Sequence, residues 1–162
     1  MKAYARSAAG FSLIEVTLAL GVAAFCLIAV IGLMAVGLKT QQASVQQTKA
    51  NAIISQIVAD LRAAMRLPPG QQSKQFSLTG HWAAQASPDQ LYFMTDGTFI
   101  TGSTNQSTAP TGAVFRASVT YLKPPTETTS LADVTVSWPA QVDPTTGTPA
   151  GKVETFAAIN RQ

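Results

Sequence analysis

The sequence predicts an α+β protein, with one long N-terminal helix whose second half carries a head of four or five mostly antiparallel strands. Three observations lead to this prediction. Residues 11–38 form an almost uninterrupted apolar block, and residues 39–67 keep a helical spacing of apolar side chains. Residues 68–162 alternate apolar and polar residues between turn-rich segments. With the short segment 1–10 before the apolar block, these make the four expected domains.

The apolar block is long enough to cross a membrane, because a helix needs about 20 residues to span the hydrocarbon core. Lys2 and Arg6 precede the block, which favours a cytoplasmic N-terminus and places the rest of the chain on the far side. An ordinary secretory signal peptide has a shorter apolar core, of about 7–15 residues, followed by a small-residue cleavage site. The length of residues 11–38 therefore predicts a single-pass transmembrane segment instead.

Glu15 is the only charged side chain within this apolar block. An acidic side chain in a transmembrane helix is costly and normally has a partner. No cation lies within one helical turn of Glu15 in the uncut chain. Cleavage between Gly10 and Phe11 would create one, because the free α-amine of Phe11 would lie four residues before the acid, in the same chain or in a neighbour. A plain membrane anchor fits the length of the block but leaves Glu15 unexplained.

The run from Gly10 to Val16, GFSLIEV, resembles the prepilin processing site of type IV pilins and pseudopilins. That family has a short basic leader that ends in Gly, then Phe or Met, then Glu at the fifth mature position. The resemblance implies that prepilin peptidase cleaves after Gly10 and methylates the amine of Phe11. It also implies that Glu15 acts in subunit assembly by neutralising the Phe11 amine of a neighbouring subunit.

Beyond the apolar block, the helix is expected to run from about Ser12 to Leu67, because Pro68-Pro69-Gly70 then stops it. One apolar stripe on its second half is predicted to dock the head. The stripe consists of Ile53, Ile54, Ile57, Val58, Leu61 and Met65. The polar residues expected to lie off the stripe are Lys49, Asn51, Gln56, Asp60, Arg62 and Arg66.

The head is predicted to be β-rich. Its first two strands are expected to flank a two-residue hairpin turn at Asp96-Gly97. The predicted strands are residues 91–95, 98–101, 113–122, 133–138 and 152–159, and the predicted exposed loops are residues 102–112 and 123–130. Val134, Val136 and Trp138 are expected on one face of their strand because side chains alternate along a strand.

Composition argues against several classes of site. The net charge is +3 without a basic stripe that interleaves with aromatic residues, so no nucleic-acid surface is predicted. His81 is the only histidine, and its neighbour Trp82 indicates packing or a loop, so neither a metal site nor a cofactor is expected. Cys26 is the only cysteine, which excludes a disulfide within the chain. Ser and Thr are abundant, but none lies in a nucleophile motif, so no enzyme activity is predicted.

The last two predicted strands, VTVSWP and KVETFAAI, resemble the ends of minor pseudopilins of the I type and of PilV-like minor pilins. They also resemble the pilin-like proteins named Verru_Chthon cassette protein B. Many true pilins close a C-terminal loop with a disulfide, and this head departs from that pattern because it lacks cysteines. Glu15 argues against the K-type tip pseudopilin, which lacks that acid.

The resemblance implies a structural subunit, a minor pseudopilin or minor pilin, of a type II secretion pseudopilus or type IV pilus-like fibre. It would be processed in the bacterial inner membrane, with its leader in the cytoplasm and its head in the periplasm. The implied partners are other pilin or pseudopilin subunits, the prepilin peptidase, an assembly platform protein and membrane lipid. The alternative is a membrane-tethered binding module that never polymerises. An enzyme with a membrane-anchored head is disfavoured because the sequence contains no recognisable set of catalytic polar residues.

Overall fold

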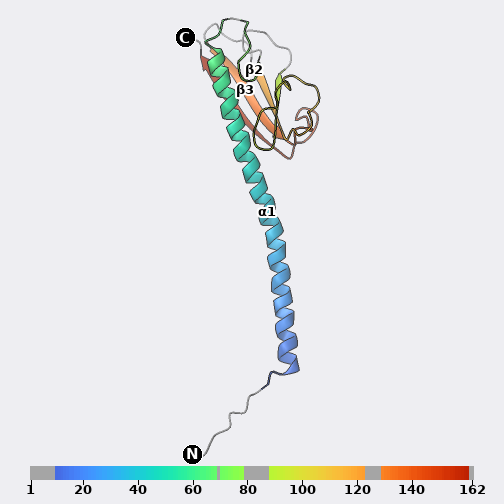
Figure 1. Cartoon of the computed structure of the whole chain (residues 1–162). Helices are drawn as coiled ribbons and strands as arrows, with labels where there is room; N and C mark the ends of the chain where they lie inside the picture. Colours follow the sequence, from blue (N-terminus) through green and yellow to red (C-terminus); the bar gives the residue numbers. More distant parts are fainter. Residues whose placement is uncertain (1–9, 69, 79–87, 123–128, 161–162) are drawn as a thin grey trace, which may run out of the picture. The chain divides into compact units, whose positions relative to one another are not determined.

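The computed structural model describes residues 10–68, 70–78, 88–122 and 129–160. The chain divides into two compact units, Met1–Gln42 and Ala43–Gln162. A single helix, α1 (Leu13–Ala64), begins in the first unit and ends in the second (Figure 1).

The first unit consists of the N-terminal part of α1 and the short segment before it. Every residue from Gly10 to Val45 is exposed, although most of them up to Leu38 are apolar. By length and composition, α1 could cross a membrane, and none of its most apolar window is buried by the described residues. The prediction of a long apolar N-terminal helix is therefore confirmed.

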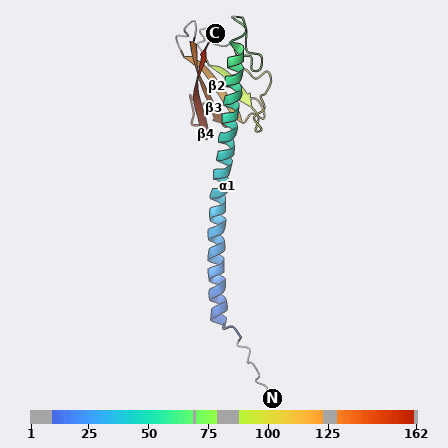
Figure 2. The same cartoon turned by 90° about the vertical axis from the view of Figure 1, so that its left-hand side faces the viewer.

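The second unit contains one antiparallel sheet in the order β1-β2-β3-β4 (Figure 2). The strands are β1 (Asp89–Phe93), β2 (Phe115–Leu122), β3 (Thr129–Trp138) and β4 (Gly151–Asn160). Consecutive strands pair along their length, so the sheet is a simple meander. The α+β fold class with four antiparallel strands is confirmed.

The core of the second unit lies between the C-terminal part of α1 and one face of the sheet. The predicted apolar stripe is largely confirmed, because Ile53, Ile57 and Leu61 are at most 2% exposed. Each such side chain contributes about 1.5–3 kcal/mol by leaving water. The buried sheet residues that face the helix are Leu91, Phe93, Phe115, Ala117, Val119, Ala132, Val134, Val136, Trp138 and Ile159. The shared face predicted for Val134, Val136 and Trp138 is confirmed.

The turn at Asp96-Gly97 is a three-residue loop, so the predicted two-residue turn is wrong. Met94 N–H donates to the Thr98 carbonyl at 2.9 Å, which closes the loop around Thr95–Gly97. Gly97 has φ +88°, the left-handed conformation that ends a three-residue hairpin loop. After the loop, residues 98–101 form only one bridge, between Phe93 and Phe99, and no named strand.

Two further boundaries differ from the prediction. Helix α1 ends at Ala64 instead of Leu67, because the amides of Arg66 and Leu67 bond to carbonyls three residues back and tighten the last turn. Residues 129 and 130 begin β3, so the predicted loop 123–130 is wrong at its end; the rest of it lies outside the described residues. Pairing with β4 extends β3 beyond what its own alternation indicates.

Among the described residues, those that cover the outer face of the sheet, away from α1, lie at one end of it. Residues 100–114 and 139–150 fold over that end, where Tyr92, Ala113 and Ala140 form a small buried cluster. Ala140 N–H donates to the Val114 carbonyl at 2.9 Å and ties the two segments together. The other end of this face exposes side chains of β2, β3 and β4.

Candidate functional site

The predicted cleavage position lies just outside α1. Gly10 and Phe11 are both exposed and precede the first helical residue, Leu13. Phe11 is 88% exposed, the largest exposed fraction among the large apolar side chains of the described residues. A Cβ atom at Gly10 would meet nothing within 4 Å. Within the part of the chain that the structure describes, the Gly10–Phe11 peptide bond is therefore exposed.

Ser12 and Glu15 cap the first turn of α1, a relationship that the sequence analysis missed. Glu15 Oε2 accepts from the Ser12 backbone N–H at 2.9 Å and from the Ser12 hydroxyl at 3.0 Å. Ser12 Oγ in turn accepts from the Glu15 backbone N–H at 3.3 Å. This reciprocal arrangement is a capping box, which satisfies amides that the first helical turn leaves without partners. The spacing Ser-x-x-Glu before an apolar run was the signal for it.

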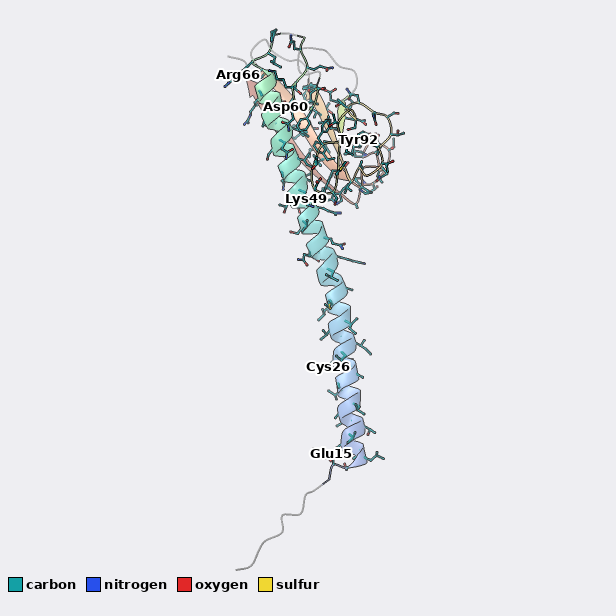
Figure 3. All side chains as sticks on the ribbon, in the orientation of Figure 1. Glu15, Cys26, Lys49, Asp60, Arg66 and Tyr92 are labelled. Atoms are coloured by element: carbon teal, nitrogen blue, oxygen red, sulfur yellow. The ribbon has the colours of Figure 1, made fainter. Side chains whose placement is uncertain are left out.

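The capping box changes the interpretation of Glu15. The prediction rested on the absence of a cation within one helical turn of the acid in the uncut chain, and its carboxylate instead has two neutral donors from Ser12. Glu15 lies in the first turn of α1, as Figure 3 shows, and a carboxylate there also complements the helix dipole. A local structural role therefore accounts for the acid without a second chain.

Next to the cap, a shallow groove runs along the helix. It is lined by Phe11, Glu15, Val16, Ala19, Leu20 and Ala23. Small side chains in such a groove allow a second helix to approach closely within a membrane.

The apolar surface of the first unit extends well beyond this groove. Sixteen large apolar side chains of the segment 11–38 are 45–88% exposed. They are Phe11, Leu13, Ile14, Val16, Leu18, Leu20, Val22, Phe25, Leu27, Ile28, Val30, Ile31, Leu33, Met34, Val36 and Leu38. Each would gain about 1.5–3 kcal/mol from burial, so together they exceed the about 5–15 kcal/mol net stability of a domain. This helix surface requires an apolar surrounding, either lipid or other helices.

In the second unit, Asp60 holds the segment after the helix. It was predicted to lie off the apolar stripe and is not part of the apolar core, but it is only 6% exposed, a burial that the sequence did not indicate. Its carboxylate accepts from the Ser73 hydroxyl and from the backbone N–H groups of Gln75 and Phe76 at 3.2 and 3.1 Å. Ser73 Oγ also accepts a hydrogen bond from Leu78 N–H at 3.0 Å. Together these bonds attach residues 73–78 to the helix. Burial of the acid is possible because its acceptor sites are filled.

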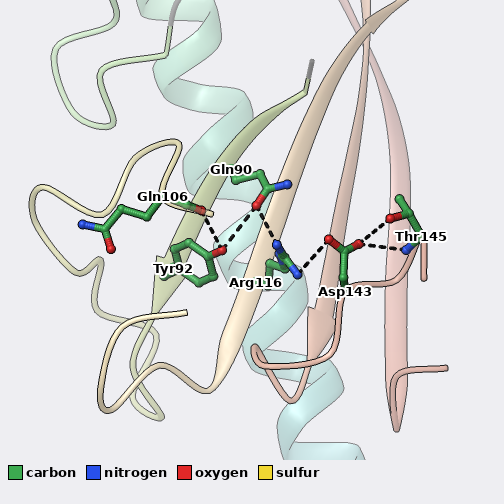
Figure 4. A network of polar contacts seen from close by, with 6 residues as sticks. All are labelled: Gln90, Tyr92, Gln106, Arg116, Asp143 and Thr145. Atoms are coloured by element: carbon green, nitrogen blue, oxygen red, sulfur yellow. Dashed lines mark hydrogen bonds and ion pairs between the residues drawn. The ribbon is translucent and has the colours of Figure 1, made fainter. Parts of the chain in front are cut away.

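A second polar network ties the outer loops to the sheet (Figure 4). Arg116 of β2 bonds to Gln90 Oε1 at 2.7 Å and forms an ion pair with Asp143 at 3.2 Å. Its guanidinium also lies 5.6 Å from the centre of the Tyr92 ring. Two hydrogen bonds from Thr145, through its hydroxyl and its backbone N–H, lower the pKa of Asp143, and the nearby Arg116 lowers it further. These contacts hold the loop 139–150 in place, so their role is structural.

The described residues contain no cluster of side chains that could bind a metal ion, because no three His, Cys, Asp or Glu side chains of these ranges lie together in a suitable way. Cys26 is exposed on α1. His81 and Trp82 lie outside the described residues, so their predicted packing role stays a prediction.

The residues singled out by the sequence, Gly10, Phe11 and Glu15, lie together around the start of α1. Ser12, Asp60, Arg116 and Asp143 were missed as contributors to structure. Comparison of the chain with protein-family models, with curated proteins and with solved structures finds no match.

Proposed function

We propose that this chain is a pilin-like structural subunit, a minor pseudopilin or minor pilin. A prepilin peptidase cleaves it between Gly10 and Phe11 and methylates Phe11. The chain then assembles through its N-terminal helix into a type II secretion pseudopilus or a type IV pilus-like fibre. It inserts in the inner membrane with the leader in the cytoplasm and the head in the periplasm.

One observation carries the proposal. The exposed Gly10–Phe11 bond stands directly before a capped helix whose apolar side chains are exposed along the whole first unit. A peptidase needs an accessible, non-helical bond, and this position supplies one. Helix packing between subunits would bury the surface that lipid covers before assembly.

The test is mass spectrometry of the chain purified from membranes of a bacterium that carries a prepilin peptidase. The expected product begins at Phe11 with one added methyl group. A stable product that retains residues 1–10 would overturn the proposal. Gly10→Val is the matched variant, because the position has no neighbour within 4 Å and so tolerates a side chain sterically. It should keep the fold and lose cleavage.

The capping box favours the second candidate, a membrane-tethered module that never polymerises, because it gives Glu15 a role within one chain. Two variants separate the candidates. Glu15→Gln keeps a side-chain acceptor at the third helical position but removes the charge, whereas Glu15→Ala removes both. If the chain is an assembling subunit, both variants should insert in the membrane but fail to enter fibres. Normal incorporation of Glu15→Gln would assign the acid to capping alone.

A further inference from the structure

The uncovered end of the outer sheet face carries a mixed apolar and acidic surface. The register places Leu122 of β2 beside Leu131 of β3, and Asp133 of β3 beside Phe156 of β4. Leu122, Leu131 and Phe156 are 37, 40 and 59% exposed. We call these four residues the sheet patch. Exposed large apolar side chains that adjoin one another mark interaction surfaces more often than isolated ones do.

Asp133 is the unsatisfied member of the sheet patch. Its Oδ1 atom is buried and has no hydrogen-bond partner among the described residues. Burial raises the pKa of the Asp133 carboxyl, and the neighbouring charge of Glu154 raises it further, while Thr135 and Lys152 oppose the shift. Glu154 is already paired with Lys152 at 3.3 Å. Because Oδ1 itself is closed to solvent, a cation on a partner protein would act on the charge of the half-buried carboxylate and not on this atom.

The opposite side of the second unit presents a basic surface. On α1, residues three or four positions apart form a ridge directly away from the buried stripe, and all of them are exposed. This helix ridge consists of Thr48, Ala52, Ser55, Ala59, Arg62 and Arg66. Arg62 and Arg66 form no ion pair with any other described residue. The ridge carries no acidic side chain, so its charge is opposite in sign to that of Asp133.

The two surfaces carry opposite charge. Phe156 is 59% exposed on the sheet patch, and the helix ridge presents the small side chains of Ala52, Ser55 and Ala59. We propose that the sheet patch of one copy binds the helix ridge of a second copy, with Asp133 paired to Arg62 or Arg66. The occupant is therefore this same chain.

The position of the two surfaces determines what such contacts build. Figure 2 shows α1 lying against one face of the sheet. Because α1 packs on this inner face, the helix ridge and the sheet patch lie on opposite faces of the second unit. A contact between two different surfaces of identical chains is heterologous, and it propagates into an open array unless the rotation closes a ring. The inference rests on the proposed function and adds to it the contact by which heads would repeat along a fibre.

The first experiment tests the contact by disulfide cross-linking of the full chain in membranes. The native cysteine is removed by Cys26→Ser. One tagged chain carries Ala59→Cys and a differently tagged chain carries Phe156→Cys, and both positions are exposed. Mild oxidation should form a disulfide between the two differently tagged chains. Either chain oxidised alone should give little cross-linked dimer. Thr148→Cys, exposed in the loop over the covered end of the sheet, is the matched control and should not join Ala59→Cys.

The second experiment tests the charges in the same cross-linking pair. Asp133→Arg on the Phe156→Cys chain, or Arg62→Asp on the Ala59→Cys chain, should each lower the yield at least about fivefold by placing like charges together. Both changes made together should restore the yield, because the pair is then reversed in sign. Restoration also shows that the single variants were folded.

Three results would overturn the inference. These are cross-linking of Phe156→Cys to itself, its cross-linking to a different protein, and an unchanged yield in both single charge variants. If the chain begins at methylated Phe11 and enters fibres but the two tags never join, this contact is wrong while the proposed function stands. If residues 1–10 remain on the chain, the proposed function fails whatever the cross-linking yield.

Discussion

Arg116 and Asp143 form an ion pair in which Nη1 lies 3.2 Å from Oδ2, with side-chain exposures of 7% and 32%. The pair joins β2 to the loop after β3, two segments that no local sequence pattern connects. Because Arg116 is nearly buried, loss of its counter-charge would leave a cation without a partner.

Asp143→Asn tests this pair. Asn keeps an oxygen acceptor for the Thr145 amide but loses the charge. We expect the free energy of unfolding of the head to fall by on the order of 2 kcal/mol. This loss is smaller than the ~3–5 kcal/mol that breaking a fully buried ion pair costs, because Asp143 is partly exposed. Denaturant unfolding of the full chain in detergent measures it. Lys152→Gln breaks the exposed pair with Glu154 and should cost under about 1 kcal/mol.

Two carboxyl groups give the head opposite dependences on pH. The pKa of Asp143 is lowered from 3.8, so its stabilisation is present above pH 3.8 and is lost as pH falls through the lowered value. The pKa of Asp133 is raised from 3.8, so its contribution is present below pH 3.8 and is lost as pH rises through the raised value.

Two variants separate these contributions in unfolding curves recorded from neutral pH down to below pH 3.8. Asp143→Asn should flatten the acid-side loss of stability. Asp133→Asn should leave the head at least as stable as the wild type at neutral pH, because it removes a disfavoured charge. A large loss in Asp133→Asn at neutral pH would contradict the assignment.

Gly151 pairs with Trp138 across β3 and β4. A Cβ atom at Gly151 would overlap the Trp138 indole, so the ring can lie over the strand only where no side chain exists. Gly151→Ala should therefore lower the free energy of unfolding by about 1–3 kcal/mol. In a Trp138→Leu background the same change should cost much less, and an equal cost in both backgrounds would exclude the steric explanation.

Asp60→Ala should loosen the segment after α1. The buried backbone N–H of Phe76 would lose its acceptor, at a cost of about 1–3 kcal/mol. Hydrogen exchange at the Phe76 and Leu78 amides should accelerate together, because Ser73 links them. Gln56→Ala, on an exposed position of the same helix, is the control and should leave both amides protected.

Ser12→Ala removes the hydroxyl of the capping box while Glu15 keeps its charge. The first turn of α1 should lose about 1 kcal/mol and fray. Hydrogen exchange at the Glu15 and Val16 amides in detergent micelles should show it. Ser12→Thr should retain protection, and Ser44→Ala, at an exposed site within the helix, should change neither amide. Unchanged exchange in Ser12→Ala would mean that water or another group caps the helix as well.

The order of elements could be predicted from the sequence because it depends on local pattern. The apolar block, the helical stripe from Ile53 to Leu61 and the alternation around Val134 each depend on the period of neighbouring residues. The hairpin turn and the end of α1 differed for local reasons, a three-residue loop and a tightened last turn. The burial of Asp60 was missed because a loop beyond the helix supplies its donors. Likewise, β3 begins before its predicted first strand residue because β4 pairs with it.

The sequence by itself determined a long apolar helix followed by a head of four or five mostly antiparallel strands, and it drew attention to Gly10, Phe11 and Glu15. Only the tertiary structure decided that Arg116 is paired with Asp143, that Gly151 makes room for Trp138, and that Asp133 is left without a partner at one oxygen. The physical reason is that backbone propensity and hydrophobic periodicity act between near neighbours in the chain. The partner of a buried charge or a large ring is set by strand register and loop packing, which join residues far apart in sequence.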